Sequence, residues 1–122
     1  MKRCVLDASA LTTFFEDRAG AEKVEDLLTK AAEAKRPLLM SVVNWGEVYY
    51  SVWRARGERA AGAKLREIAQ LPIEIVGVDE ELARLAATLK AEHNMPYSDC
   101  FASALAQSRK ADIVTSDKDF ER

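Results

Sequence analysis

Four acidic residues of this chain stand in short motifs that are spread along the sequence, namely Asp7, Glu47, Asp99 and Asp117. Asp7 and Asp117 follow apolar runs typical of core strands, where a desolvated carboxylate is costly without a partner. Lys118 is the nearest basic residue to any of these motifs. Carboxylates brought close together raise one another's pKa, and a hard divalent cation removes that penalty. Oxygen ligands alone favour Mg²⁺ or Mn²⁺ over Zn²⁺, so the pattern indicates metal-ion chemistry.

Short apolar runs alternate with amphipathic segments. Strands are expected at Arg3–Leu6, Leu38–Met40, Ile73–Val76 and Asp112–Thr115. Helices are expected at Ser9–Phe15, Ala21–Ala31, Ser41 to about Arg56, Ala61–Gln70, Asp79–Leu89 and Ser98–Ala106, with Ser9, Ser41, Asp79 and Ser98 as N-caps. The alternation predicts an α/β, three-layer sandwich, with a mainly parallel sheet of four or five strands flanked by helices. We expect residues 1–122 to form a single domain.

The positions of the acids follow from this arrangement. In an open parallel sheet, a site forms beyond the carboxyl ends of the strands, where the strand order reverses. Asp7 comes directly after the first expected strand, and Asp117 soon after the fourth. Glu47 shares a polar helix strip with Asn44, and Asp99 lies in the first turn of a helix. Each acid alone has a structural explanation, as a cap, a turn residue or a complement to a helix dipole. The ordered set favours a common site.

Four segments, each holding one acid, resemble the motifs of the PIN-domain family. They are Val5-Leu6-Asp7-Ala8-Ser9-Ala10-Leu11, Asn44-Trp45-Gly46-Glu47-Val48, Tyr97-Ser98-Asp99-Cys100-Phe101-Ala102-Ser103-Ala104-Leu105-Ala106 and Val114-Thr115-Ser116-Asp117-Lys118-Asp119-Phe120. Their order and spacing fit the family across essentially the whole chain. The small size resembles the toxin half of VapBC-type toxin–antitoxin pairs.

The resemblance implies a parallel sheet flanked by helices, a Mg²⁺- or Mn²⁺-dependent endoribonuclease, and inhibition by a small antitoxin protein. It carries over the four acids as the catalytic and metal-binding residues. Around them, the supporting residues would be Ser9, Asn44, Thr115 and Asp119. It also implies products with a 5′-phosphate and a 3′-hydroxyl. The family commonly has a further short strand after the fourth motif, and this sequence ends at Arg122.

Composition narrows the function further. The net charge is −2, which neither supports nor excludes nucleic acid as a partner. His93 is the only histidine, so a two-histidine mechanism for cleaving RNA without metal is excluded. Cys4 and Cys100 are far apart and are interpreted as small buried hydrophobes. No apolar run is long enough to span a bilayer or serve as a secretory signal, so we expect a cytoplasmic protein without membrane contact.

Two surface features leave alternatives open. Arg54, Arg56 and Arg59 could guide RNA phosphates towards the acids, or could form a solvated helix face. An aromatic stripe recurs every four residues at Trp45, Tyr49 and Trp53. This stripe could belong to the core, to a homodimer contact or to a groove for an inhibitor, and because Val43, Val48 and Tyr50 already offer a core face, it favours an interface and a homodimer.

Two other functions compete with the nuclease. A haloacid-dehalogenase phosphatase would need a second Asp two residues after Asp7, where Ser9 stands, and a receiver domain would need paired acids there. A catalytically silent PIN-like module that binds RNA or protein is the second alternative. The presence of all four acids argues against it.

Overall fold

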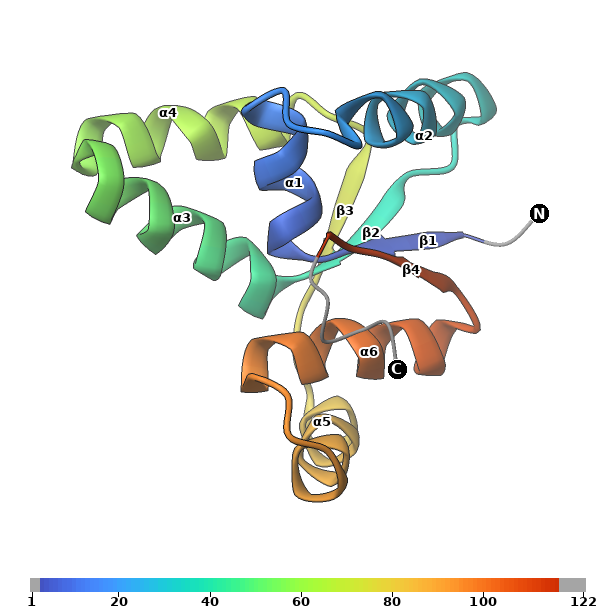
Figure 1. The fold of residues 1–122 in the computed structure, drawn as a ribbon. Helices are drawn as coiled ribbons and strands as arrows, with labels where there is room; N and C mark the ends of the chain where they lie inside the picture. Colours follow the sequence, from blue (N-terminus) through green and yellow to red (C-terminus); the bar gives the residue numbers. More distant parts are fainter. Residues whose placement is uncertain (1–2, 117–122) are drawn as a thin grey trace.

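The fold is built on one parallel sheet. The computed structural model describes residues 3–116. The strands are β1 (Cys4–Leu6), β2 (Leu38–Ser41), β3 (Ile73–Val76) and β4 (Asp112–Val114). They lie in the order β3-β2-β1-β4, and every pairing is parallel. The α/β class and the parallel sheet expected from the sequence are confirmed, with four strands among the described residues (Figure 1).

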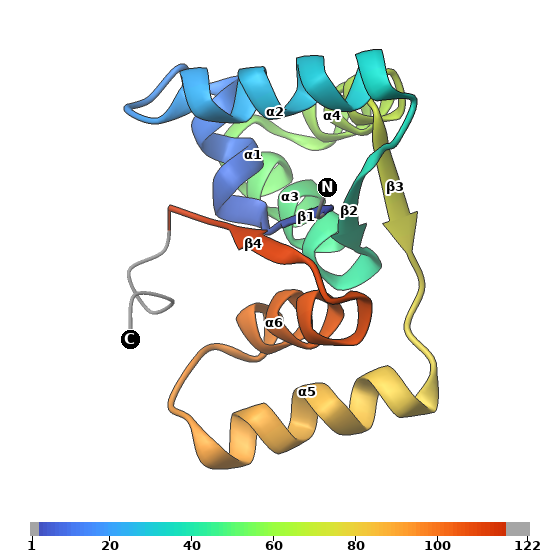
Figure 2. The same ribbon diagram turned by 90° about the vertical axis from the view of Figure 1, so that its right-hand side faces the viewer.

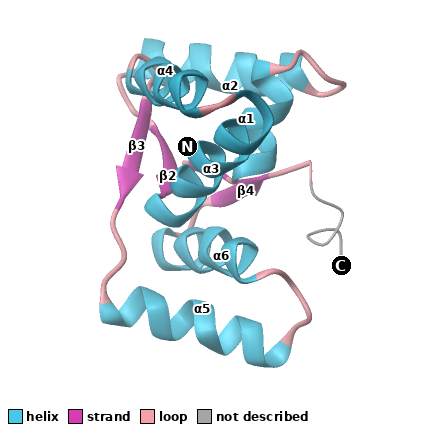
Figure 3. Ribbon diagram, turned by 90° about the vertical axis from the view of Figure 1, so that its left-hand side faces the viewer, coloured by secondary structure: helices cyan, strands magenta, loops and turns pink. Residues whose placement is uncertain are grey.

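Helices cover both faces of the sheet. They are α1 (Ala8–Phe15), α2 (Ala21–Ala34), α3 (Val42–Arg56), α4 (Glu58–Ala69), α5 (Glu80–Glu92) and α6 (Tyr97–Arg109). The connections from β1 to β2 and from β2 to β3 place α1 to α4 on one side, and the connection from β3 to β4 places α5 and α6 on the other (Figures 2 and 3). Between residues 3 and 116, a helix with the length and apolarity of a membrane span does not occur.

The layers follow from the alternation of side chains along the strands. Val5 and Leu39 point to the core that contains α5 and α6, while Leu6, Leu38 and Met40 point to the core that contains α1 to α4. All of these side chains are buried. Removing this apolar area from water on both faces fixes the strand register, because a slip of one residue would exchange the two faces.

Helix starts are where the sequence-based expectations fail most often. Ser9 lies inside α1, and Asp7 is the N-cap, accepting a hydrogen bond from the Ala10 amide. Similarly Ser98 lies inside α6, because the Pro96 carbonyl accepts the amides of Asp99 and Cys100 and so begins the helix two residues earlier. The fourth helix also begins earlier than expected, after Gly57, whose positive φ of 95° separates it from α3. The N-caps Ser41 and Asp79 are confirmed.

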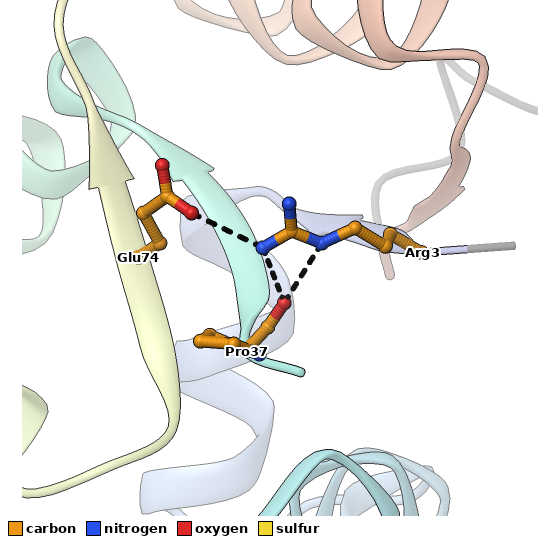
Figure 4. A network of polar contacts seen from close by, with 3 residues as sticks. All are labelled: Arg3, Pro37 and Glu74. Carbon is orange, nitrogen blue, oxygen red and sulfur yellow. Dashed lines mark hydrogen bonds and ion pairs between the residues drawn. The ribbon is translucent and has the colours of Figure 1, made fainter. Parts of the chain in front are cut away.

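At the amino ends of the strands, one arginine connects three segments (Figure 4). The guanidinium of Arg3 donates from Nε and Nη2 to the Pro37 carbonyl at 3.2 and 2.8 Å. The same Nη2 lies 3.1 Å from Oε1 of Glu74 in β3. Arg3 therefore joins the beginnings of β1 and β2 to the outer strand, through part-buried bonds to Pro37 and an exposed ion pair with Glu74.

Candidate active site

The candidate site lies at the carboxyl ends of β1 and β4, where the strand order reverses. From β1 the chain moves to β2 and β3 on one side, while β4 pairs with β1 on its other side. The strand order therefore reverses between β1 and β4, and a site is expected at the carboxyl ends of these two neighbouring strands. Asp7 directly follows β1, and Thr115 and Ser116 directly follow β4.

Asp7 is buried, with 1% of its surface exposed. Its Oδ1 accepts hydrogen bonds from the Ser9 hydroxyl at 2.8 Å and from the Ala10 amide at 2.9 Å. Its Oδ2 accepts a short hydrogen bond from the Thr115 hydroxyl. The N-terminus of α1 adds a favourable dipole for a negative charge. These contacts hold the carboxylate in one orientation through hydroxyl and backbone donors.

A chain of hydroxyl groups continues from Asp7 to the residues that follow β4. The hydroxyls of Ser9 and Thr115 lie 3.0 Å apart, and the Ser116 amide donates to the Ser9 hydroxyl at 3.0 Å. The Ser116 hydroxyl in turn accepts from Thr13 at 3.1 Å. These contacts join the first helix to the end of the last strand. Ser9 and Thr115 were expected to support the acids, whereas Thr13 and Ser116 were not. Their contacts span more than a hundred residues, so the local sequence carries no signal for them.

Asn44 connects the helix of Glu47 to the helix of Asp99. Asn44 has no exposed surface, and Asp99, in the first turn of α6, is 6% exposed. The Asn44 Nδ2 lies 3.4 Å from Oε1 of Glu47 and donates to the Ser98 carbonyl at 3.1 Å. The polar strip expected on the helix of Glu47 is thus confirmed at Asn44, and it docks α3 onto the start of α6.

Three of the four expected acids, Asp7, Glu47 and Asp99, lie among the described residues. Among residues 3–116, no group of three or more His, Cys, Asp or Glu side chains lies close enough to hold a metal ion. Asp117 and Asp119 lie outside the described residues, so the expected cluster of four acids stays a prediction. The donor chemistry does fit a hard cation, because Asp7, Glu47 and Asp99 offer carboxylate oxygens. In addition, the buried Oδ1 of Asn44 has no hydrogen-bond partner among the described residues.

The chain matches a known protein family over almost its whole length. The model of the PIN domain family matches residues 4–122. The chain belongs to the PIN domain family. None of the curated proteins with which this PIN domain was compared matches it.

Several solved structures resemble this PIN domain. VapC20 of Mycobacterium tuberculosis, described as a toxin that cleaves the sarcin-ricin loop, is 18% identical, with a TM-score of 0.73 over 97% of this chain and 92% of that one. DNA-bound VapBC2 of Rickettsia felis is 17% identical, with a TM-score of 0.74 over 98% and 91%. DNA-bound VapBC of Salmonella typhimurium is 19% identical, with a TM-score of 0.75 over 100% and 92%. These likenesses concern the fold.

The basic residues lie away from the acids of this PIN domain. Arg54 and Arg56 are exposed near the end of α3, and Arg59 is exposed at the start of α4. Arg54 is about 10 Å from Glu47 along the helix axis, at about 1.5 Å per residue. Its guanidinium lies over the Tyr50 ring at 5.4 Å from the centroid. The structure thus makes the three arginines a solvent-facing group that begins two turns beyond Glu47.

The aromatic residues of α3 divide between core and surface. Trp45 packs against the core on the side of α1 to α4, whereas Trp53 is 44% exposed and contacts the edge of Tyr49. Tyr50 is 50% exposed, so its expected place in a core face is wrong. The cause is the neighbouring helix α4, which packs on another side of α3 and leaves the Tyr50 side uncovered.

Beside this helix lies a groove between α1, α3 and α4. It is lined by Thr12, Phe15, Glu16, Val48, Ser51, Val52, Ala55, Arg56 and Lys64. The Lys64 ammonium lies 4.0 Å from the centre of the Phe15 ring. The groove therefore combines an apolar floor with two cations at its rim.

Both thiols are free, as expected from the sequence. Burial raises the pKa of the Cys100 thiol, an effect that Lys90 opposes and the neighbouring Asp99 reinforces. Burial likewise raises the pKa of Cys4, with Asp112 adding to the shift and Lys23 opposing it. Both shifts disfavour the thiolate, which is the reactive form of cysteine.

Proposed function

We propose that this PIN domain is a Mg²⁺- or Mn²⁺-dependent endoribonuclease and the toxin of a VapBC-type toxin–antitoxin pair. The observation that carries the proposal is the buried carboxylate of Asp7 at the point where the strand order reverses. It is oriented by the hydroxyls of Ser9 and Thr115 and by the start of α1. Through Asn44, Glu47 on α3 is joined to the start of α6, which carries Asp99.

The chemical roles follow from this arrangement. A bound divalent cation lowers the pKa of water and neutralises charge on phosphoryl oxygens. Asp7 would hold the cation with its orientation fixed by its hydroxyl donors, and Glu47, Asp99 and Asp117 would complete the oxygen donors. One of these carboxylates would orient the attacking water or accept its proton. Hydrolysis of the phosphodiester bond would leave a 5′-phosphate and a 3′-hydroxyl.

RNA binding would use the exposed arginines. Arg54 and Arg56 are exposed near the end of α3, and Arg59 is exposed at the start of α4. Phosphate contacts of this kind position a nucleic acid without reading its sequence. The three arginines would therefore set affinity and its salt dependence, and leave the choice of RNA to other contacts.

The proposed partner is a small antitoxin protein. Similar folds occur in a toxin–antitoxin complex from Klebsiella pneumoniae, 21% identical with a TM-score of 0.65 over 94% of this chain and 87% of that one, and in the VapBC complexes. On this chain, the groove between α1, α3 and α4 offers an apolar floor with Arg56 and Lys64 at its rim. Such a groove suits an amphipathic segment that carries acidic residues. A homodimer, expected from the aromatic stripe, stays a prediction.

The experiment is a metal titration of the wild-type protein and of Asp7→Asn, followed by an RNA cleavage gel. Asn also caps helices well, so the variant should keep α1. We expect wild type to cut RNA in Mg²⁺ or Mn²⁺, to lose activity in EDTA, and to lose at least about 100-fold in rate through Asp7→Asn. Equal cleavage without divalent metal would refute the mechanism. Metal binding without cleavage of any RNA would instead favour the catalytically silent module.

A further inference from the structure

Asn44 holds a position that the simple account of a four-acid site does not explain. It is fully buried, although an amide side chain loses its hydrogen bonds to water when it is buried. Its Nδ2 contacts Glu47 Oε1 on α3 and the Ser98 carbonyl on α6. Both neighbours are acceptors, which fixes the orientation of the amide group with nitrogen towards them and oxygen away.

The oxygen of the same amide is the unexplained atom. Asn44 Oδ1 is buried and has no hydrogen-bond partner among residues 3–116. A buried acceptor without a partner is costly, so such an atom in a folded protein calls for an explanation such as a bound ion. This atom belongs to a rigid planar group whose other end touches Glu47 and the residue before Asp99. Glu47 and Asp99 are two of the acids proposed to surround the cation, so the amide of Asn44 lies beside the residues of the proposed site.

We infer that Asn44 supplies its Oδ1 as a further oxygen ligand of the hydrated divalent cation. Its Nδ2 at the same time connects Glu47 to the start of α6. The inference rests on the proposed function, since it assumes that a divalent cation binds there. A neutral amide oxygen adds a ligand of the type that Mg²⁺ and Mn²⁺ accept, without adding another negative charge to the carboxylates. It also explains why a buried polar side chain occupies the interface between α3 and α6, where an apolar one would pack equally well.

The test measures binding of Mn²⁺ alone, without RNA, by the loss of the free-ion electron paramagnetic resonance signal. Three variants of the full chain are compared with wild type. Asn44→Leu keeps the volume and removes both polar atoms. Asn44→Asp keeps a side-chain oxygen and loses the donor. Asn94→Leu makes the same chemical change at an exposed residue between α5 and α6, and serves as the control.

We expect Asn44→Leu to raise the Kd for Mn²⁺ by about 10-fold or more, the size of effect seen for groups that surround a bound metal. Asn44→Asp should bind Mn²⁺ at least as tightly as wild type at neutral pH, and Asn94→Leu should match wild type. A purely structural tether predicts otherwise, because both Asn44 variants would then lose the bond to Ser98 and weaken binding alike. Thermal melting without metal separates a loss of stability from a loss of binding.

Three results would overturn the inference. One is a Kd for Asn44→Leu within about twofold of wild type, below the effect expected of a group that surrounds a metal. Another is an Asn44→Asp protein that binds as weakly as Asn44→Leu. If wild type itself binds no Mn²⁺, the metal in the proposed function fails together with the inference. If wild type binds Mn²⁺ and only the comparison of the Asn44 variants fails, the inference alone is overturned. Should Asn44→Leu not fold, Asn44→Ala replaces it in the same comparison.

Discussion

The two edges of the sheet treat charge in opposite ways. At the amino edge, Arg3 pairs with Glu74 and the Pro37 carbonyl in contact with water. At the carboxyl edge, Asp7 is buried and its oxygens accept bonds from hydroxyls and a backbone amide. Opposite charges in water gain little from pairing, whereas the hydroxyl and amide donors around Asp7 orient a carboxylate that is out of contact with water.

The difference indicates which residues of this fold serve its stability and which serve the proposed activity. Near their beginnings, β1 and β3 are joined by the ion pair between Arg3 and Glu74, which is partly exposed to water. The strands end in a region where the chain direction, two helix starts and a chain of hydroxyls place a few side chains with defined orientation. Substitutions at the amino edge should therefore change stability slightly, and those at the carboxyl edge should change activity.

The largest contrast is expected between two glutamates. Glu47→Gln should lower the rate of RNA cleavage by at least about 100-fold, because it removes a charge proposed to face the cation. Glu74→Gln removes the same charge at the amino edge, and should leave the rate within about twofold because an exposed ion pair contributes little. Cleavage assays at matched protein and Mg²⁺ concentrations check both. A comparable loss in the two variants would contradict the division between the edges.

A smaller effect is expected from the hydroxyl that orients Asp7. Ser9→Ala removes donors and acceptors that connect Asp7, Thr115 and Ser116. We expect cleavage to fall by about 10-fold, in the range seen for groups that orient metal ligands. The control is Ser108→Ala, which removes a hydroxyl bonded only to the Leu105 carbonyl of its own helix. Equal rates for Ser9→Ala and the control would show that Asp7 needs no such support.

At the amino edge, the change should appear in stability alone. Arg3→Met removes the contacts to Pro37 and Glu74 while keeping an apolar stem. We expect the free energy of unfolding to fall by about 0.5–1 kcal/mol, the range for a partly exposed ion pair with its hydrogen bonds. Urea denaturation followed by circular dichroism measures the change, and a cleavage assay should give the wild-type rate. A loss of activity at unchanged stability would show that the two edges are coupled.

The smallest contrast concerns the thiols. Burial raises the pKa of both Cys4 and Cys100, so both stay protonated at neutral pH. Because the thiolate is the reactive form, native alkylation by iodoacetamide should be slow near pH 7 and should accelerate as the pH rises past the ordinary thiol value of about 8.5. Cys4, which is partly exposed, should react before the fully buried Cys100. Mass spectrometry of the two peptides over time measures the order, and the urea-unfolded chain provides the reference rate.

Much of the fold could be predicted because local pattern and topology agree. The four strands, the caps Ser41 and Asp79 and the break at Gly57 are all encoded by neighbouring residues. Three helix starts were misplaced, those of α1, α4 and α6. A serine near a helix start resembles an N-cap, but the competing Asp7 side chain and the Pro96 carbonyl take that role in α1 and α6.

Within the candidate site, the sequence alone determined which edge holds Asp7, because an acid directly after a core strand of a parallel sheet must lie at its carboxyl end. It also determined that Asn44 and Glu47 share one helix face, through the helical period. Asp117 and Asp119 rest on the sequence motifs alone.

Tertiary structure decided the contacts between distant segments. The hydroxyl chain from Asp7 through Ser9 to Thr115 and Ser116 exists because β4 pairs with β1, and the Asn44 bridge exists because α6 packs against α3. The same packing left Tyr50 exposed and Asn44 buried on one helix. Periodicity gives each side chain a direction, but only the packed neighbours decide whether that direction leads to water, to the core or to another polar group.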